Sequence, residues 1–310
     1  MGPIKVAVAQ LAPDGADRDR TVAKACSAIA EAARNGARLI AFPETFILGY
    51  PYFTLFLPPT QINEHVRALY RDALHVPGPE TAVLADAARR AQCHVVMGLH
   101  ERRGGTLFNS QLFLGPDGAI LGCRRKLVPT SHERMLWGRG DGSDLNVYPT
   151  ELGTLGGLIC YEHSNALFRY ALQAQGEQIH IAAWPGGMPG INNLIDAAAR
   201  HYAFEAQAFV LNATSVLTEP ALAALPVEVQ SKLKPGGGYS GILSPRGEWL
   251  AGPVLDGEAL LYAELDFGLI DAMKAIVDSA GHYARPDVVQ LKLNRTPQSP
   301  LDDGDTPIDG

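Results

Sequence analysis

Near the middle of the chain, an apolar run ends at a cysteine: Gly153-Thr154-Leu155-Gly156-Gly157-Leu158-Ile159-Cys160-Tyr161-Glu162-His163-Ser164. Its leucine and isoleucine residues predict a buried strand that stops at Cys160. Gly156 and Gly157 leave space for another backbone to approach closely. Ser164 is expected to cap a helix over residues 165–175, so the stretch predicts a strand, a sharp turn and a helix.

Cys160 is the candidate nucleophile of this stretch. A cysteine between a strand end and a helix start lies near backbone N–H groups and the positive end of a helix dipole, and both favour the thiolate. The alternative is an inert buried thiol, and position alone does not decide between the two.

Composition narrows the functional classes. The chain has 310 residues, of which 46% are hydrophobic and 19% charged, which is enough for one large core or two modest ones. A formal net charge of −7 argues against a nucleic-acid binder, and no run approaches the ~18 apolar residues of a membrane span.

The four cysteines are scattered, without CxxC or zinc spacing, which predicts reduced thiols and no metal site. With no signal-peptide pattern at the start of the sequence, we expect a cytoplasmic protein.

The remaining periodicity predicts alternating strands and helices, with right-handed crossovers in a partly parallel sheet. We expect a single domain over 1–293 and a disordered tail rich in proline and aspartate over 294–310. Residues 218–234 are expected to form a loop. The main expected strands are 4–10, 38–42, 94–99, 106–114, 119–125, 178–184, 208–214, 239–243 and 258–266, and the main helices are 18–35, 61–74, 80–92, 192–207 and 267–277.

Two further charged side chains stand where predicted strands end. Glu44 follows the apolar strand 38–42, and Lys126 follows the strand 119–125. Thiolate, carboxylate and ammonium together can attack an electrophilic carbon, move its protons and stabilise the charge that develops. A simple turn carboxylate is the alternative for Glu44, and we interpret Arg124 as part of a solvated basic strand edge.

Residues 46–59 are strongly apolar and aromatic but broken by glycine and proline. Such a loop lies against a pocket, a partner chain or its own core.

These motifs resemble the nitrilase (carbon–nitrogen hydrolase) superfamily over about residues 4–295. The resemblance rests on three short motifs in order: Ala41-Phe42-Pro43-Glu44-Thr45, Arg125-Lys126-Leu127-Val128-Pro129-Thr130 and Gly157-Leu158-Ile159-Cys160-Tyr161-Glu162. Segments within 132–143, 169–180 and 281–287 are similar to the nitrilase branch of that superfamily.

The resemblance implies a catalytic Glu44–Lys126–Cys160 triad supported by Glu133. It also implies a four-layer α-β-β-α sandwich that pairs into αββα–αββα dimers. The implied reaction converts a small nitrile and water to a carboxylic acid and ammonia, with no cofactor. A homodimer or larger homo-oligomer is expected.

The sequence departs from the usual nitrilase pattern at Tyr161, Ser131 and Ala166, where tryptophan, tyrosine and proline are usual. These differences suggest an unusual specificity. The proposed pocket walls, each of which could instead be ordinary core, are Tyr50, Tyr52, Tyr161, Trp184 and Met188.

Two other functions stay open at this stage. An amidase or carbamoylase of the same superfamily would use the same triad. A catalytically silent protein that binds a partner through residues 46–59 belongs to another class, and the intact triad argues against it.

Overall fold

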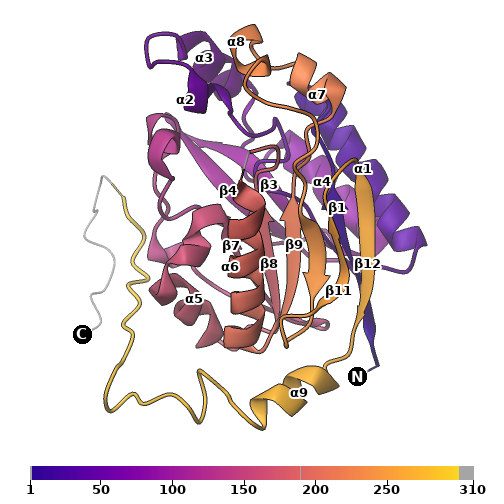
Figure 1. Cartoon of the computed structure of the whole chain (residues 1–310), viewed down its shortest axis with the longest axis vertical. Helices are drawn as coiled ribbons and strands as arrows, with labels where there is room; N and C mark the ends of the chain where they lie inside the picture. Colours follow the sequence, from indigo (N-terminus) through magenta and orange to yellow (C-terminus); the bar gives the residue numbers. More distant parts are fainter. Residues whose placement is uncertain (1, 189, 300–310) are drawn as a thin grey trace.

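The computed structural model describes residues 2–188 and 190–299, and within them two six-stranded sheets lie face to face (Figure 1). The first sheet has a parallel centre, β1–β2–β3, with antiparallel strands at both sides. Its order is β12 (Ala259–Leu265), β1 (Ile4–Gln10), β2 (Leu39–Ala41), β3 (His94–Arg103), β4 (Thr106–Leu114) and β5 (Ile120–Arg125).

The second sheet repeats this plan around the parallel strands β7–β8–β9. Its order is β11 (Trp249–Val254), β10 (Ser240–Leu243), β9 (Phe209–Thr214), β8 (Ile179–Trp184), β7 (Gly153–Ile159) and β6 (Tyr148–Thr150). The predicted strand–helix–strand alternation and its parallel pairing are confirmed.

Helices cover the outer face of each sheet. Helices α1 (Arg18–Arg34) and α4 (Pro79–Ala91) pack on the first sheet, and α5 (Ala166–Gln173) and α6 (Ile191–Ala206) on the second (Figure 1). Helix α1 illustrates why these segments form helices that cover a sheet. Asp17 caps its N-terminus, and its apolar residues recur at helical spacing and are buried on one face. The predicted α-β-β-α sandwich is therefore confirmed, and pairing into a dimer stays a prediction.

Between the sheets lies an aliphatic core to which both contribute. Val6, Val8 and Val96 of the first sheet pack with Ile181 and Leu211 of the second, and none of them is exposed. Both sheets therefore have two apolar faces, which explains the continuous apolar runs in their central strands.

One end of the sandwich is covered by short helices, which are α2 (Phe53–Phe56), α3 (Asn63–Asp72), α7 (Glu219–Ala223) and α8 (Val227–Gln230). The prediction of a plain loop over 218–234 is wrong, because Thr218 caps α7 and α8 follows directly. The apolar stretch 46–59 packs largely on its own core, since Phe46 and Ile47 are fully buried beneath the first sheet.

The described part of the chain ends with α9 (Gly268–Lys274) and a segment, residues 275–299, that has no helix or strand. Of the predicted tail 294–310, residues 300–310 lie outside the described residues, so its disorder stays a prediction. Within residues 294–299, Arg295 donates to Gln175 at 2.8 Å and the Gln298 N–H donates to Asp141 at 2.8 Å.

None of the helices within residues 2–188 and 190–299 has both the length and the hydrophobicity that crossing a membrane requires.

Candidate active site

The ends of three strands bring the predicted triad together. Glu44 lies just beyond β2, Lys126 directly follows β5, and Cys160 directly follows β7. Glu133 comes from a 3₁₀ helix, η1 (Ser131–Met135). Ligand atoms of Glu44, Glu133 and Cys160 all lie within 4.8 Å of one another, and each of the four side chains is at most 2% exposed.

Lys126 stands between the two carboxylates. Its Nζ donates to Glu44 Oε1 at 2.9 Å and to both oxygens of Glu133 at 2.7 and 3.0 Å. Burial alone would lower the pKa of Lys126, but the charges of Glu44, Cys160 and Glu133 outweigh it and raise that pKa. Lys126 is therefore a fixed cation.

Glu44 is arranged as a base. Its Oε1 accepts from Lys126 and, at 2.6 Å, from Asn109 Nδ2, while its Oε2 is buried and has no hydrogen-bond partner among the described residues. Burial raises the pKa of Glu44 to about 7, with Lys126 opposing the shift and Glu133 adding to it. One oxygen is thus anchored and the other is free to take a proton at neutral pH.

The backbone around Glu44 is strained and close-packed. Thr45, the next residue, has a φ of 45°, which a β-branched residue rarely adopts. A Cβ on Gly98 of β3 would lie 1.9 Å from the Pro43 carbonyl, so only glycine lets the neighbouring strand approach this turn.

Glu133 is held by several donors besides Lys126. The Thr130 N–H donates to its Oε2 at 2.6 Å, and the Tyr50 hydroxyl donates to its Oε1 at 2.8 Å. His132 Nε2 lies 2.9 Å from the same hydroxyl, so Tyr50 links this histidine to the cluster.

Cys160 sits at a strained elbow, with a φ of 54°. Burial, together with the nearby Glu44 carboxylate, raises the pKa of its thiol well above the usual value, although Lys126 and the Tyr161 N–H act in the opposite direction. The backbone N–H groups at the strand end favour the thiolate, but here burial and the Glu44 carboxylate outweigh them. Cys160 needs a base, and Glu44 is next to it.

The helix after the elbow also begins later than predicted. Residues Cys160–Ser164 form a 3₁₀ turn, η3, and α5 starts at Ala166 with Asn165 as its N-cap. Ser164 does not cap α5, because its hydroxyl donates back to the Tyr161 carbonyl at 2.8 Å. The dipole of α5 is thus six residues away from the thiol in sequence.

Arg124 is not the solvated edge residue that we expected. Its guanidinium is fully buried and bonds Glu162 through two contacts at 2.7 and 2.8 Å. Arg124 lies in β5 and Lys126 directly follows it, so the two-residue period of a strand places both side chains on the same face. This spacing is the feature of the sequence that could have predicted a buried Arg124.

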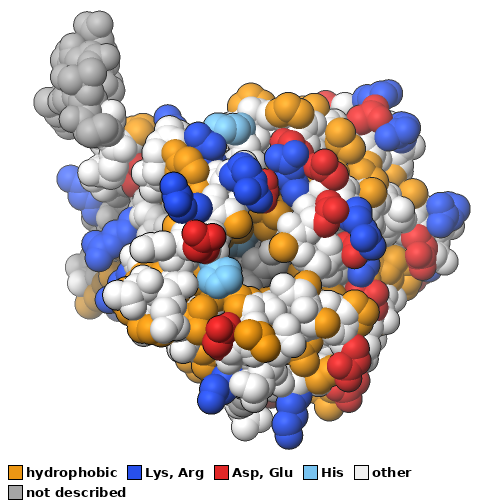
Figure 2. All heavy atoms as spheres, turned by 90° about the horizontal axis from the view of Figure 1, so that it is seen from above, with side chains coloured by type: hydrophobic (Ala, Val, Ile, Leu, Met, Phe, Trp, Pro, Cys, Tyr) orange, Lys and Arg blue, Asp and Glu red, His pale blue; other side chains and the backbone are white. Residues whose placement is uncertain are grey.

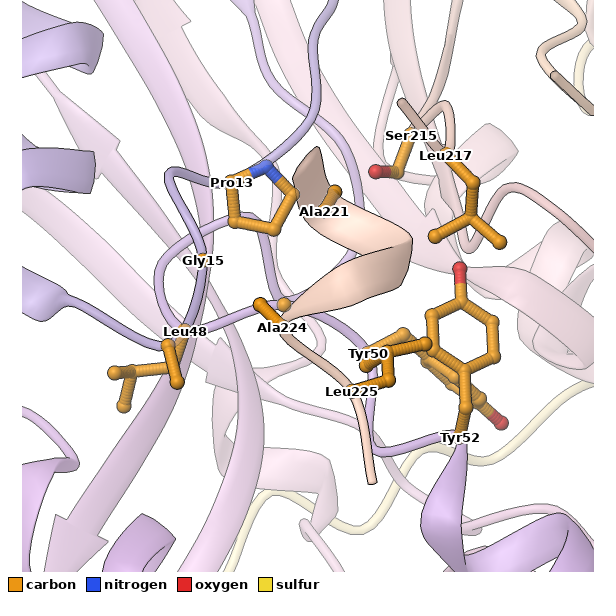
Figure 3. Close-up of a pocket in the computed structure, with 12 residues that line it drawn as sticks. Pro13, Gly15, Leu48, Tyr50, Tyr52, Ser215, Leu217, Ala221, Ala224 and Leu225 are labelled. Atoms are coloured by element: carbon orange, nitrogen blue, oxygen red, sulfur yellow. The ribbon is translucent and has the colours of Figure 1, made fainter. Parts of the chain in front are cut away.

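The five predicted pocket walls do not lie together. Tyr50 and Tyr52 line a cavity of about 50 Å³ with Pro13, Leu48 and residues of 215–225 (Figure 3). The Tyr52 hydroxyl donates to the Gly186 carbonyl at 2.5 Å. Tyr50 therefore contacts the charged cluster with its hydroxyl and this cavity with its ring.

Tyr161 and Trp184 line a different hollow, of about 380 Å³, between η3 and α6. The side chain of Tyr161 is 42% exposed, while Trp184 is fully buried. Met188 is half-buried and packs against both the α6 core and the core beneath α2 and α7.

Figure 2 views the end of the molecule that carries α2, α3, α7 and α8. The surface is hollowed near the centre of this view, and side chains of both charge signs stand around the hollow.

Glu44, Glu133 and Cys160 have the spacing of metal ligands. However, the ammonium of Lys126 already occupies the place between the two carboxylates and pairs with both. The two carboxylates are therefore already paired with the positive charge of Lys126.

Comparisons with known proteins agree with this geometry. Residues 5–275 match the family model described as carbon–nitrogen hydrolase. The chain is 41% identical over 302 residues to a nitrilase of Paraburkholderia phymatum, covering 96% of this chain and 88% of the relative. It is 40% identical over 310 residues to an aliphatic nitrilase of Rhodococcus rhodochrous, covering 96% and 84%.

Solved structures show the same fold at low sequence identity. A carbon–nitrogen hydrolase from Helicobacter pylori superposes with a TM-score of 0.74 at 20% identity, covering 92% of this chain and 97% of that one. An amidase from Nesterenkonia sp. AN1 superposes with a TM-score of 0.68 at 17% identity, covering 92% and 95%.

Proposed function

The chain belongs to the carbon–nitrogen hydrolase family, in its nitrilase branch, and on that premise we propose that it hydrolyses an organic nitrile to the carboxylic acid and ammonia. The observation that carries this proposal is the contact of Glu44, Lys126 and Glu133 around the buried Cys160 thiol. The names of the most similar relatives support nitriles as the substrate class.

In the first half of the reaction, the free Oε2 of Glu44 takes the thiol proton and Cys160 Sγ adds to the nitrile carbon. The C≡N bond becomes the C=NH of a thioimidate. Lys126 and the Tyr161 N–H stabilise negative charge on the nitrogen. The nitrogen receives the proton that Glu44 took from the thiol, so Glu44 is a carboxylate again before water attacks.

In the second half, Glu44 removes a proton from water, which adds to the thioimidate carbon. The nitrogen is protonated and leaves as ammonia, so a thioester remains on Cys160. A second water molecule releases the acid and restores the thiol. Glu133 keeps Lys126 oriented throughout, because it accepts two hydrogen bonds from Nζ.

This sequence includes a branch point. If ammonia leaves the tetrahedral intermediate slowly, the thiol leaves instead and an amide is released. A fraction of amide product is therefore part of the proposal.

The alternative is an amidase or carbamoylase with the same residues, since a thiolate also attacks an amide carbon. Ammonia release from aliphatic, aromatic and arylacetic nitriles and from the matching amides separates the two functions. Turnover of nitriles supports the proposal, and turnover of amides alone assigns the amidase function. No turnover of either by folded protein with a titratable thiol would support a silent binding protein instead.

We also propose further properties of the protein that the sequence predicts. They include a single catalytic domain over 1–293 and a cytoplasmic location supported by four unpaired cysteines. Of the five predicted pocket walls, Tyr50 and Tyr52 stay proposed for the substrate pocket, because the Tyr50 hydroxyl contacts Glu133, whereas Tyr161 and Trp184 line the other hollow. A homodimer or larger oligomer is supported by the exposed Leu167 and Phe204 on the outer helical layer, 61% and 59% accessible. Light scattering after gel filtration tests the oligomer.

A further inference from the structure

A chain of buried polar side chains ends on the backbone of Cys160. The Tyr202 hydroxyl donates to Glu177 Oε2, and Glu177 Oε1 lies 2.8 Å from His180 Nδ1. His180 Nε2 lies 2.9 Å from His163 Nε2, and His163 Nδ1 lies 2.8 Å from the Cys160 carbonyl oxygen. We call Tyr202, Glu177, His180 and His163 the histidine chain, and none of them is more than 2% exposed.

The carbonyl end determines the direction of these hydrogen bonds. A carbonyl oxygen only accepts, so His163 Nδ1 must carry a proton and donate to Cys160. Burial and the neighbouring His180 lower the pKa of His163 well below its usual value, so this ring is neutral and its Nε2 accepts. His180 Nε2 is therefore the donor to His163.

The same logic places a proton on Glu177. Burial lowers the pKa of His180 well below its usual value and raises the pKa of Glu177 to about 8. A neutral His180 that donates from Nε2 accepts at Nδ1, so the Glu177 carboxyl donates there and its other oxygen accepts from Tyr202. Every bond in the chain then points toward Cys160.

The residues packed around the histidine chain hold its side chains in place. A Cβ on Gly156 would lie 2.0 Å from Glu177 Oε1, so the glycine leaves space for the carboxyl group. The Tyr202 ring stacks on His180 with centroids 3.7 Å apart, and Trp184 stacks on His163 at 4.7 Å. Each histidine ring thus has an aromatic ring stacked against it.

Charged groups also act on the histidine chain. Arg124 of β5 acts on Glu177, His180 and His163, and Glu162 of η3 acts on both histidines. These two groups form an ion pair with each other, which keeps a net charge away from the rings. Near Tyr202, Glu205 and Arg169 form a second pair.

We propose that the histidine chain positions and polarises the Cys160–Tyr161 peptide, so that the Tyr161 N–H becomes a stronger donor to the thiolate and to the nitrile nitrogen. The carbonyl that accepts from His163 and the N–H that faces the thiol belong to the same peptide unit. A hydrogen bond accepted by one end of a peptide strengthens the donor at its other end. The proposal rests on the proposed function, and the four members are positioning residues.

The first test compares two substitutions of one ring. His163→Asn keeps a side-chain N–H close to the position of Nδ1, whereas His163→Phe keeps the volume without a donor. Because one donor to the reacting atoms is worth about 100-fold or more, we expect polarisation of that donor to be worth about 10-fold. We expect His163→Phe to lower kcat by this factor with KM unchanged, and His163→Asn to restore most of it.

A second readout does not depend on turnover. The rate at which iodoacetamide alkylates Cys160, followed by mass spectrometry of its peptide against pH, reports the pKa of this thiol. We expect His163→Phe to raise that pKa and His163→Asn to return it toward the natural value. Equal kcat and equal alkylation profiles for folded His163→Phe and natural protein would overturn the proposal.

Substitutions of Glu177 test the direction of the hydrogen bonds in the histidine chain. Gln has a donor for His180 and an acceptor for Tyr202, so Glu177→Gln should rescue the loss seen in Glu177→Leu. A Gln variant as impaired as the Leu variant would contradict a protonated Glu177. If these variants do not fold, ¹⁵N NMR of the natural protein decides, since a His163 ring without a proton on Nδ1 would overturn the assignment.

The tests separate this inference from the function on which it rests. Absence of nitrile turnover by the natural protein would refute the proposed function and leave the alkylation profiles interpretable. Nitrile turnover with unchanged alkylation in His163→Phe would refute only the inference.

Discussion

The guanidinium of Arg124 donates two hydrogen bonds to the carboxylate of Glu162, at 2.7 and 2.8 Å, and both side chains are withdrawn from solvent. Glu162 also accepts from the Leu127 and Ile159 N–H groups, each at 2.7 Å. These four bonds tie the residue after Lys126 to the residue before Cys160. The ion pair thus holds the two strand ends that carry the ammonium and the thiol.

Arg124→Met removes one partner of this ion pair and leaves a buried carboxylate without its cation. We expect a loss of roughly 3–5 kcal/mol in the free energy of unfolding, measured with urea. The double variant Arg124→Met/Glu162→Gln serves as the control and should be more stable than Arg124→Met alone. A single variant within about 1 kcal/mol of the natural protein would show that the pair does not hold the elbows.

The activity should depend on pH through Glu44. Its pKa is raised to about 7, and the ionised form is the base, so kcat/KM should rise as pH increases from 6 to 8. The apparent pKa belongs to the cluster of Glu44, Lys126 and Cys160, because these groups interact closely. A pH–rate profile that is flat across this range would contradict the assignment of Glu44 as the base.

Lys126 should stabilise the protein as well as the reaction. Lys126→Met leaves Glu44 and Glu133 buried without a cation, so stability should fall by roughly 3–5 kcal/mol at pH 8 and by less at pH 6, where Glu44 is largely protonated.

The matched control is Glu44→Gln, which leaves Lys126 paired with Glu133 alone. A carboxyl whose pKa is raised by folding contributes stability that is lost as pH rises through about 7. Glu44→Gln should therefore unfold with less dependence on pH between 5 and 8 than the natural protein. At pH 8, Glu44→Gln should unfold at a higher temperature than Lys126→Met, because it leaves no buried carboxylate without its cation. A lower unfolding temperature for Glu44→Gln would argue against this charge arrangement.

Tyr50→Phe should lower kcat by about 10-fold, the rate equivalent of one hydrogen bond to a charged group, because the hydroxyl donates to Glu133. Tyr52→Phe is the comparison, since that hydroxyl donates to the Gly186 carbonyl and not to Glu133. Steady-state kinetics of the two variants measure the difference. Equal effects would mean that Tyr50 does not support Glu133.

Much of the architecture could be predicted because its signals are local. The apolar runs before Glu44 and Cys160 predicted strands that the structure shows as β2 and β7, and the hairpin before Lys126 is present as β4 and β5. A strand end is visible in the sequence, so the three groups of the triad could be selected without knowing how the two sheets meet.

The features that were missed depend on contacts across the sheets. Arg124 looks like an exposed cation along one strand, and its partner Glu162 lies 38 residues away in η3, just past a strand of the other sheet. The protonation of Cys160 depends on complete burial beside Glu44, which a helix-dipole argument along the chain does not include. Tyr161 was expected near the other pocket walls, but the elbow turns its side chain toward α6.

The central claim is that Cys160 is the nucleophile for a nitrile. The most direct test is ammonia release from the best nitrile of the panel by natural protein and by Cys160→Ala, with matching circular dichroism and thermal unfolding. We expect steady ammonia release by the natural protein and none above background for the variant. Nitrile hydrolysis by Cys160→Ala at a rate near that of the natural protein would contradict it.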